Sequence, residues 1–284
     1  KENNKKAAAK TPDVKIRDAI AAPYPDRGLP IALSLTYTNT PEGMQLSSSM
    51  QIPSMLLKFS PEDGKEKASV IVAGSFFNER GQAGARFVEQ ITVTALNQNM
   101  RTAADSVQYT YLVNLKPGLY HVRVAALDEK GGRTGSAHGW VEIPDLSSRQ
   151  LATSSLIIAW KGENAVNNES GNGDPLAENA RFSIDRQFKR DSYLRFFIFV
   201  YNAKRAADSL PDVAIQVQIL RDNQPVLTIA LKKLSTEGVD LERLPYAADL
   251  NLEGLSTGRY LLQVTVIDRV SKTSASQHAR FDIE

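Results

Sequence analysis

Leu115-Lys-Pro-Gly118-Leu-Tyr120-His-Val-Arg-Val124 recurs downstream as Leu255-Ser-Thr-Gly258-Arg-Tyr260-Leu-Leu-Gln-Val264. The offset from Gly118 to Gly258 is 140 residues (258 − 118). The same register then holds to the end of the chain, where it aligns further pairs: Asp128 with Asp268, Ser136 with Ser276, His138 with His278, and Ile143 with Ile283. A match of this length at one offset indicates two copies of one β domain.

Each copy of the repeat enters its strand through Gly-x-Tyr, with Leu three residues before the Gly. This pattern resembles the tyrosine corner of Greek-key sandwiches, in which the phenol bonds to the backbone upstream and ties the fold together. We therefore assign structural roles to Gly118, Tyr120, Gly258 and Tyr260.

Apolar residues recur at every second position in short runs bounded by Pro, Gly, Asn or Asp, which is typical of strands. In the first copy we expect strands at Ile31–Tyr37, Met55–Phe59, Ala68–Phe77, Phe87–Ala95, Ser106–Val113, Leu119–Leu127 and Gly139–Ile143. In the second copy we expect them at Ser155–Trp160, Arg181–Asp185, Tyr193–Tyr201, Val213–Leu220, Val226–Leu231, Ala247–Leu252, Tyr260–Asp268 and Ala279–Ile283. Asp222–Pro225 is interpreted as a hairpin turn. About seven strands per copy predict an all-β chain of two tandem immunoglobulin or fibronectin III-like sandwiches.

The non-alternating segment Pro144–Ala152 separates the copies, so we place the domains at 25–147 and 148–284, with a linker and N-terminal arm at 1–24. The charged start, Lys1–Lys10, lacks large apolar residues and is interpreted as a linker to something upstream. Val14–Ala22 has either a helical spacing, with Asp13 as its cap, or the character of an edge strand.

Composition limits the classes of function. The chain has 34 basic and 32 acidic residues, a net charge of +2, and no basic block, so no nucleic-acid partner is expected. Cysteine is absent, which removes disulfides, thiolate metal sites and a cysteine nucleophile. No apolar run reaches the length of a membrane-spanning helix, so no membrane insertion is expected.

Several segments of the chain resemble the β-rich C-terminal region of the VWFA-related domain proteins common in Acidobacteria. They are Pro25–Pro30, Pro117–Val124, Val200–Ala203, Leu220–Val226 and Thr273–Gln277. In that family the region follows a von Willebrand factor A-like domain. The resemblance implies an extracytoplasmic module, which would be periplasmic, cell-surface or secreted, downstream of such a domain. The Asp-x-Ser-x-Ser metal loop of an A domain does not occur in this chain, so its metal-dependent adhesion chemistry is not carried over.

The oxygen-rich loop Asn167–Asp174 is the weak candidate for a metal site. Asn168, Asn172 and Asp174 fall at spacings loosely like those of a calcium loop, but no bidentate Glu follows, and a solvated loop is the favoured interpretation. We therefore predict no metal ligand and no cofactor. The three histidines, His121, His138 and His278, accompany no nucleophile motif, so no catalytic residue is predicted either.

These observations predict a non-catalytic protein-interaction or spacer module with an unidentified protein partner. Two alternatives stay open. A carbohydrate-binding module would place two or three exposed aromatic side chains on one concave surface, so a glycan is also a candidate ligand. A structural stalk or assembly subunit would pair its sheet edges with other chains. Because the repeat pairs His138 with His278 and Asp128 with Asp268, function is expected where the copies differ. Such places are the Asn167–Asp174 loop, Trp140, which aligns with Arg280, and the junction Pro144–Ala152.

Overall fold

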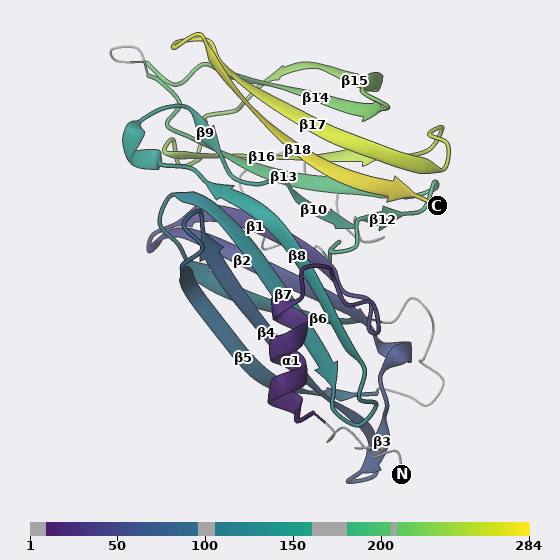
Figure 1. Ribbon diagram of the computed structural model, residues 1–284. Helices are drawn as coiled ribbons and strands as arrows, with labels where there is room; N and C mark the ends of the chain where they lie inside the picture. Colours follow the sequence, from purple (N-terminus) through teal and green to yellow (C-terminus); the bar gives the residue numbers. More distant parts are fainter. Residues whose placement is uncertain (1–9, 96–105, 161–180, 206–208) are drawn as a thin grey trace, which may run out of the picture. The chain divides into compact units, whose positions relative to one another are not determined.

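The computed structural model describes residues 10–95, 106–160, 181–205 and 209–284, and it is built almost entirely of antiparallel strands with one short α-helix (Figure 1). The all-β prediction with sandwich-like sheets is confirmed. The immunoglobulin or fibronectin III strand count stays a prediction. The chain divides into two compact units. Unit 1 contains the residues up to Leu35 and Ser47–Ile143, and unit 2 contains Thr36–Leu46 and Pro144–Glu284.

The first part of the chain forms helix α1 and strands β1 to β8. Their bounds are α1 Pro12–Ala21, β1 Ala32–Thr40, β2 Gly43–Pro53, β3 Ser60–Glu62, β4 Lys65–Asn78, β5 Ala83–Thr94, β6 Ser106–Asn114, β7 Gly118–Asp128 and β8 Thr134–Ile143. One sheet has the order β1-β2-β6; in the other, β4, β7 and β8 lie in that order, and β5 and β3 also pair with β4. The two sheets face each other, since Phe76 of β4 meets Tyr111 of β6 with ring centroids 5.9 Å apart.

The second part of the chain forms strands β9 to β18. Their bounds are β9 Ala152–Thr153, β10 Ile157–Trp160, β11 Arg181–Phe182, β12 Gln187–Phe188, β13 Tyr193–Tyr201, β14 Val213–Arg221, β15 Gln224–Lys233, β16 Arg243–Asn251, β17 Gly258–Asp268 and β18 Thr273–Ile283. One sheet runs β11-β10-β13-β16, with β9 also on β13, and the other runs β12-β18-β17-β14-β15. Alternate residues of the central strands, such as Leu262, Val264 and Val266, enter one shared core.

Unit 2 also holds the tip of the β1–β2 hairpin. The Tyr37 backbone N–H donates to Ser155 Oγ at 3.0 Å, and the Ser155 N–H donates to the Tyr37 carbonyl at 3.1 Å. The Asn39 N–H donates to the Tyr201 hydroxyl at 2.9 Å. The repeat does not indicate that the hairpin tip belongs to unit 2, because the partners of these contacts lie more than a hundred residues away in the sequence.

One predicted strand is wrong. Met55–Phe59 is not a strand, because a short 3-10 helix occupies Ser54–Leu56, while the long strand β2 was missed. Strand β2 does alternate, with Met44, Leu46, Met50 and Ile52 buried, but Ser48 takes the central inward position and interrupts the apolar pattern.

The N-terminal segment is the helix α1 rather than an edge strand. Thr11 stands at the N-cap without a side-chain bond, and Pro12 opens the helix, so Asp13 lies in the first turn and is not the cap. Ile16 and Ala19 are buried against Ala73, Ala125 and Leu127. A ten-residue helix is marginal by itself, so this packing on the sheet stabilises it.

The repeat-equivalent aspartates Asp128 and Asp268 both end their strands fully buried. Asp128 accepts the Lys58 N–H at 2.9 Å and the Gly131 N–H at 3.1 Å. Asp268 accepts the N–H groups of Lys204 at 2.8 Å and Val270 at 2.9 Å, and the Ser271 hydroxyl at 2.7 Å. In each copy, one carboxylate therefore holds the turn after its strand and a distant loop together.

Burial by itself raises the pKa of the Asp268 carboxyl group. The hydrogen bonds from Lys204, Ser271 and Val270 outweigh burial and hold its pKa below the ordinary value. The contribution of this group to stability is therefore present above the pKa of an unfolded Asp, about 4, and is lost as the pH falls through the folded pKa.

We expect Asp268→Asn to lower the free energy of unfolding by about 1–3 kcal/mol at neutral pH, because the amide cannot accept the same set of charged hydrogen bonds. Urea denaturation measures the change. The difference from the wild type should shrink below about pH 4. The exposed Glu237→Gln serves as the control and should show neither effect. An equal loss at neutral and acid pH would contradict this account.

Candidate functional site

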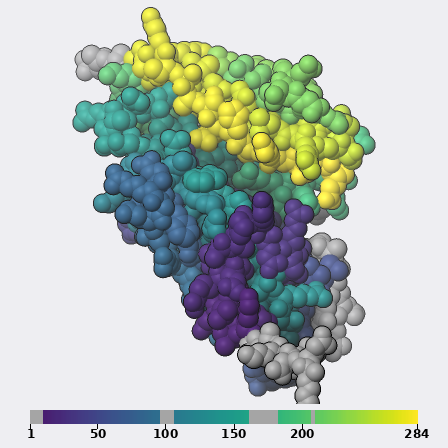
Figure 2. All heavy atoms as spheres, in the orientation of Figure 1, coloured from purple at the N-terminus to yellow at the C-terminus, as the bar shows by residue number. Residues whose placement is uncertain are grey.

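The outer face of the β5-β4-β7-β8 sheet is the feature that distinguishes unit 1. Cross-strand pairing sorts its side chains into rows. Two rows, Ala73 with Ala125 and Ile71 with Leu127, lie under α1. The helix covers these apolar rows, and in Figures 1 and 2 it lies on this face in purple.

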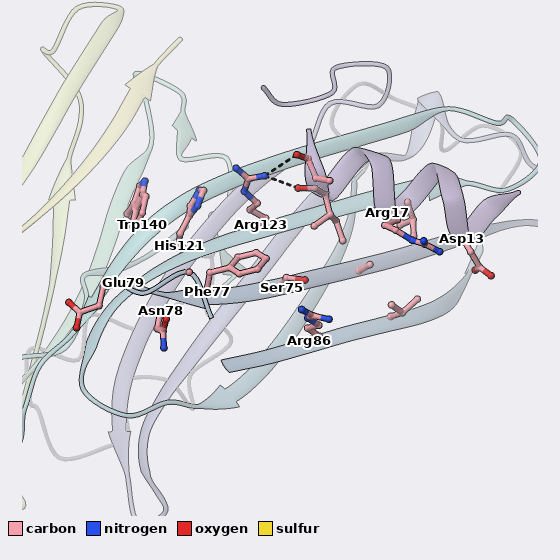
Figure 3. A pocket seen from close by; sticks show the side chains of 16 residues that line it. Asp13, Arg17, Ser75, Phe77, Asn78, Glu79, Arg86, His121, Arg123 and Trp140 are labelled. Carbon is pink, nitrogen blue, oxygen red and sulfur yellow. Dashed lines mark hydrogen bonds between the residues drawn. The ribbon is translucent and has the colours of Figure 1, made fainter. Parts of the chain in front are cut away.

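The next two rows lie beyond the helix. One contains Phe77, His121 and Trp140 on three neighbouring strands. The other contains Arg86, Ser75, Arg123 and His138. Except for His138, the residues of these two rows and α1 bound a groove of about 810 Å³ (Figure 3). Ile16, Arg17, Ile20 and Val88 line its other parts, and Asp13 and Glu79 contribute carboxylates.

Trp140 is the dominant exposed group of the groove, with 60% of its surface accessible. Its indole stacks on the His121 imidazole, with ring centroids 4.3 Å apart and an angle of 9° between the planes. His121 in turn lies against His138, with Nε2 and Nδ1 separated by 3.3 Å. Trp140 thus lies outside the core, whereas the other tryptophan, Trp160, packs on Phe188 with ring centroids 4.5 Å apart.

Arg123 joins the sheet to the helix. Its guanidinium donates to the carbonyls of Ile20 at 3.1 Å, Ala21 at 3.3 Å and Ala22 at 3.3 Å. Dashed lines in Figure 3 mark those of these hydrogen bonds that join residues drawn there. These carbonyls end α1 and have no partner within the helix, and a cation there also opposes the negative end of the helix dipole. Arg123 therefore fixes the helix wall of the groove.

Two further guanidinium groups face the groove without a carboxylate partner. Arg17 projects from α1 and Arg86 from β5 (Figure 3). Both side chains are exposed, and neither forms an ion pair with any residue that the structure describes. With Arg123, they outnumber the lining carboxylates Asp13 and Glu79. The groove thus combines apolar walls with an excess of positive charge.

The equivalent face of unit 2 is different in kind. Its rows contain Leu220, Leu261 and Arg280, then Gln218, Gln263 and His278. Here the polar side chains bond to one another: His278 Nε2 lies 3.1 Å from Gln263 Oε1, and Gln218 donates to Thr228 Oγ1 at 3.2 Å. Leu220 and Leu261 are partly buried on this face, and the polar side chains beside them can be solvated without a covering helix. The exchange of Trp140 for Arg280 is therefore part of a change across the whole face.

The other predicted residues have structural positions. The Tyr120 hydroxyl donates to the Lys116 carbonyl at 3.1 Å, and the Tyr260 hydroxyl to the Ser256 carbonyl at 2.7 Å. Gly118 and Gly258 precede them with φ of 140° and 145°, a region that favours glycine. Asn168, Asn172 and Asp174 lie outside the described residues. Elsewhere, the described residues contain no group of three or more His, Asp or Glu side chains suited to hold a metal ion.

Comparisons of the chain with known proteins give similar solved structures but no family match. No family model matches it, and no curated protein matches it. Among solved structures it is similar to Escherichia coli alpha-2-macroglobulin activated by porcine elastase, with 12% sequence identity and a TM-score of 0.25. The match covers 90% of this chain and 22% of that chain, so the chain spans under a quarter of the other protein's length. Within the described ranges, no helix has the length and apolarity needed to cross a membrane.

We expect Arg123→Met to loosen the end of α1, because three carbonyls lose their donor. Hydrogen–deuterium exchange in α1 should accelerate by about tenfold, which corresponds to about 1.4 kcal/mol of local stability. The matched control is Gln263→Met, the repeat-equivalent position in unit 2. It should leave exchange in α1 unchanged, and the same acceleration in both variants would contradict the capping role.

The pKa of His121 lies below the ordinary 6.5, because burial and then the charges of Arg123 and His138 disfavour its protonated form. In an NMR titration of the wild type we expect its midpoint below that value. Removing one of the two neighbouring charges with Arg123→Met should move the midpoint upward. A midpoint that stays in place would show that Arg123 has no influence on the ring.

Proposed function

We propose that this chain is a non-catalytic protein-interaction module whose binding surface is the groove of unit 1. The observation that carries the proposal is the exposed Trp140 row beside Arg17 and Arg86, which form no ion pair with the described residues, on a face where the two copies of the repeat differ. Tryptophan and arginine are the residues that dominate binding energy at protein interfaces. A surface built only for spacing has no need of this combination.

The chemistry of the groove suits a segment of another protein that carries carboxylates beside apolar side chains. Ile20 and Val88 offer aliphatic surface, which accommodates side chains of a peptide. Arg17 and Arg86 offer planar guanidinium groups that can hold a carboxylate through two hydrogen bonds. The excess of guanidinium over carboxylate groups favours an acidic segment.

The proposed position of the module in a longer protein, and its location in the cell, are argued from the sequence. The order of the segments from Pro25–Pro30 to Thr273–Gln277 supports a position downstream of a von Willebrand A-like domain in an extracytoplasmic protein. The first of these segments has a structural role: Asp26 accepts the Ser136 N–H from β8 at 2.9 Å through its carbonyl, and Leu29 is fully buried. Catalysis is not part of the proposal, since the groove histidine His121 contacts His138 rather than a hydroxyl nucleophile.

A carbohydrate-binding module is the second candidate, because a flat exposed indole also stacks on sugar rings. The sugar would rest on Trp140, but Phe77 and His121 are only partly exposed, so the platform is narrow. A glycan array probed with the same protein separates the two. Binding of a glycan that depends on Trp140, without binding of any peptide, would replace the protein-interaction proposal.

Phage-displayed random peptides provide the test of a protein ligand. Selected peptides should carry Asp or Glu beside apolar residues, and Trp140→Ala should weaken their binding by about thirtyfold, or ~2 kcal/mol, as expected for a central interface residue. The matched control Arg280→Ala changes the equivalent position of unit 2 and should leave binding intact. Selection of no peptide, or peptides that bind Trp140→Ala equally well, would contradict the proposal.

A further inference from the structure

Strand β15 is the last strand of the β12-β18-β17-β14-β15 sheet of unit 2 (Figure 1). Within the described part of the chain it pairs with β14 alone, so the backbone groups along its other edge have no strand partner. Every residue of the strand is exposed except Ile229, which is partly buried. An open edge of this length is a template for another strand.

The middle of β15 lacks the charged residues that often protect such an edge, and Leu227–Ile229 pairs regularly with β14 between two register shifts. No charged residue occurs between Gln224 and Leu231, and the apolar side chains there are accessible: Val226 is 48% exposed, Leu227 36% and Leu231 45%. Strand β5, the corresponding edge strand of unit 1, carries Arg86 and Glu89 along its length. Inserted charges of this kind block edge-to-edge pairing, so the two edges are not equivalent.

The ends of β15 are closed and have opposite charge. Pro225 has no N–H to donate at one end, and the turn before it carries Asp222. Lys232 and Lys233 stand at the other end. The open segment is therefore Val226–Leu231. When two such strands run antiparallel, the acidic end of each lies beside the basic end of the other, which is the favourable arrangement of charge.

We propose that β15 pairs with β15 of a second copy of this chain, antiparallel and about a two-fold axis, which joins the two sheets into one. Side chains that lie opposite each other in an antiparallel pair point to the same face of the sheet. A two-fold axis between the strands therefore places one residue opposite the same residue of the other copy. Centred on Thr228, it sets Leu227 of each copy opposite Ile229 of the other, within the stretch of β15 that pairs regularly with β14. Threonines that face each other across strands are a favourable pair, and Lys232 of each copy then lies toward the Asp222 turn of the other.

This surface is separate from the groove, so the proposal goes beyond the proposed function and can fail without it. Sedimentation of the whole chain between about 1 and 100 µM should show a reversible dimer, since an interface of one strand pair is expected to be weak. Thr228→Lys sets two lysines against each other and should weaken the dimer by more than tenfold. Thr92→Lys on the exposed edge strand β5 is the matched control and should leave it unchanged.

The absence of native cysteine permits a direct check of the register. Thr228→Cys should form a covalent dimer on mild oxidation, whereas Thr92→Cys should stay monomeric. Thermal unfolding of each variant confirms that it is folded. A wild-type chain that is monomeric throughout the concentration range, a dimer that Thr228→Lys leaves intact, or a β15 edge that binds only a different protein overturns the proposal.

Discussion

The structure of unit 1 depends on the fact that strand β7 is central and must be covered on both faces. Tyr120, Val122, Val124 and Ala126 enter the sandwich, but Ala125 and Leu127 on the opposite face are also apolar and fully buried. Without a cover they would expose apolar surface to water. Helix α1 provides the cover, and Arg123, two residues before Ala125 on the same face, binds its last carbonyls.

The groove follows from this constraint. A ten-residue helix covers only part of a face formed by four long strands, so the rows that contain Trp140 and Arg86 lie beside it and stay accessible. The helix wall, the aromatic row and the guanidinium groups are thus parts of one arrangement. In unit 2 the equivalent strand β17 carries Gln263 and Thr265 on this face, where water can solvate them, and no helix is needed.

The repeat in the sequence accounts for the parts that both units share. The hydroxyls of Tyr120 and Tyr260 donate to the carbonyl four residues upstream. Asp128 and Asp268 accept backbone N–H groups of the turns that follow them, in the same register in both copies. These interactions are local or lie at strand ends, where a short motif is enough to specify them. Strand β13 and the Asp222 hairpin were also predicted from neighbouring residues. In the structure, Asp222 and Asn223 adopt the positive φ of a two-residue turn.

The sequence by itself indicated most of the strands, the internal repeat and the motifs at strand ends, because a two-residue period and turn chemistry depend on neighbouring residues. It left three matters to the tertiary structure. Whether Val14–Ala22 became a helix depended on an apolar sheet face distant in the sequence, and the burial of Ser48 at an inward position of the continuous strand β2 was visible only in the fold. The site itself was indicated only by the exchange of Trp140 for Arg280, since exposure, stacking on His121 and the approach of Arg17 and Arg86 arise when separate strands and the helix meet.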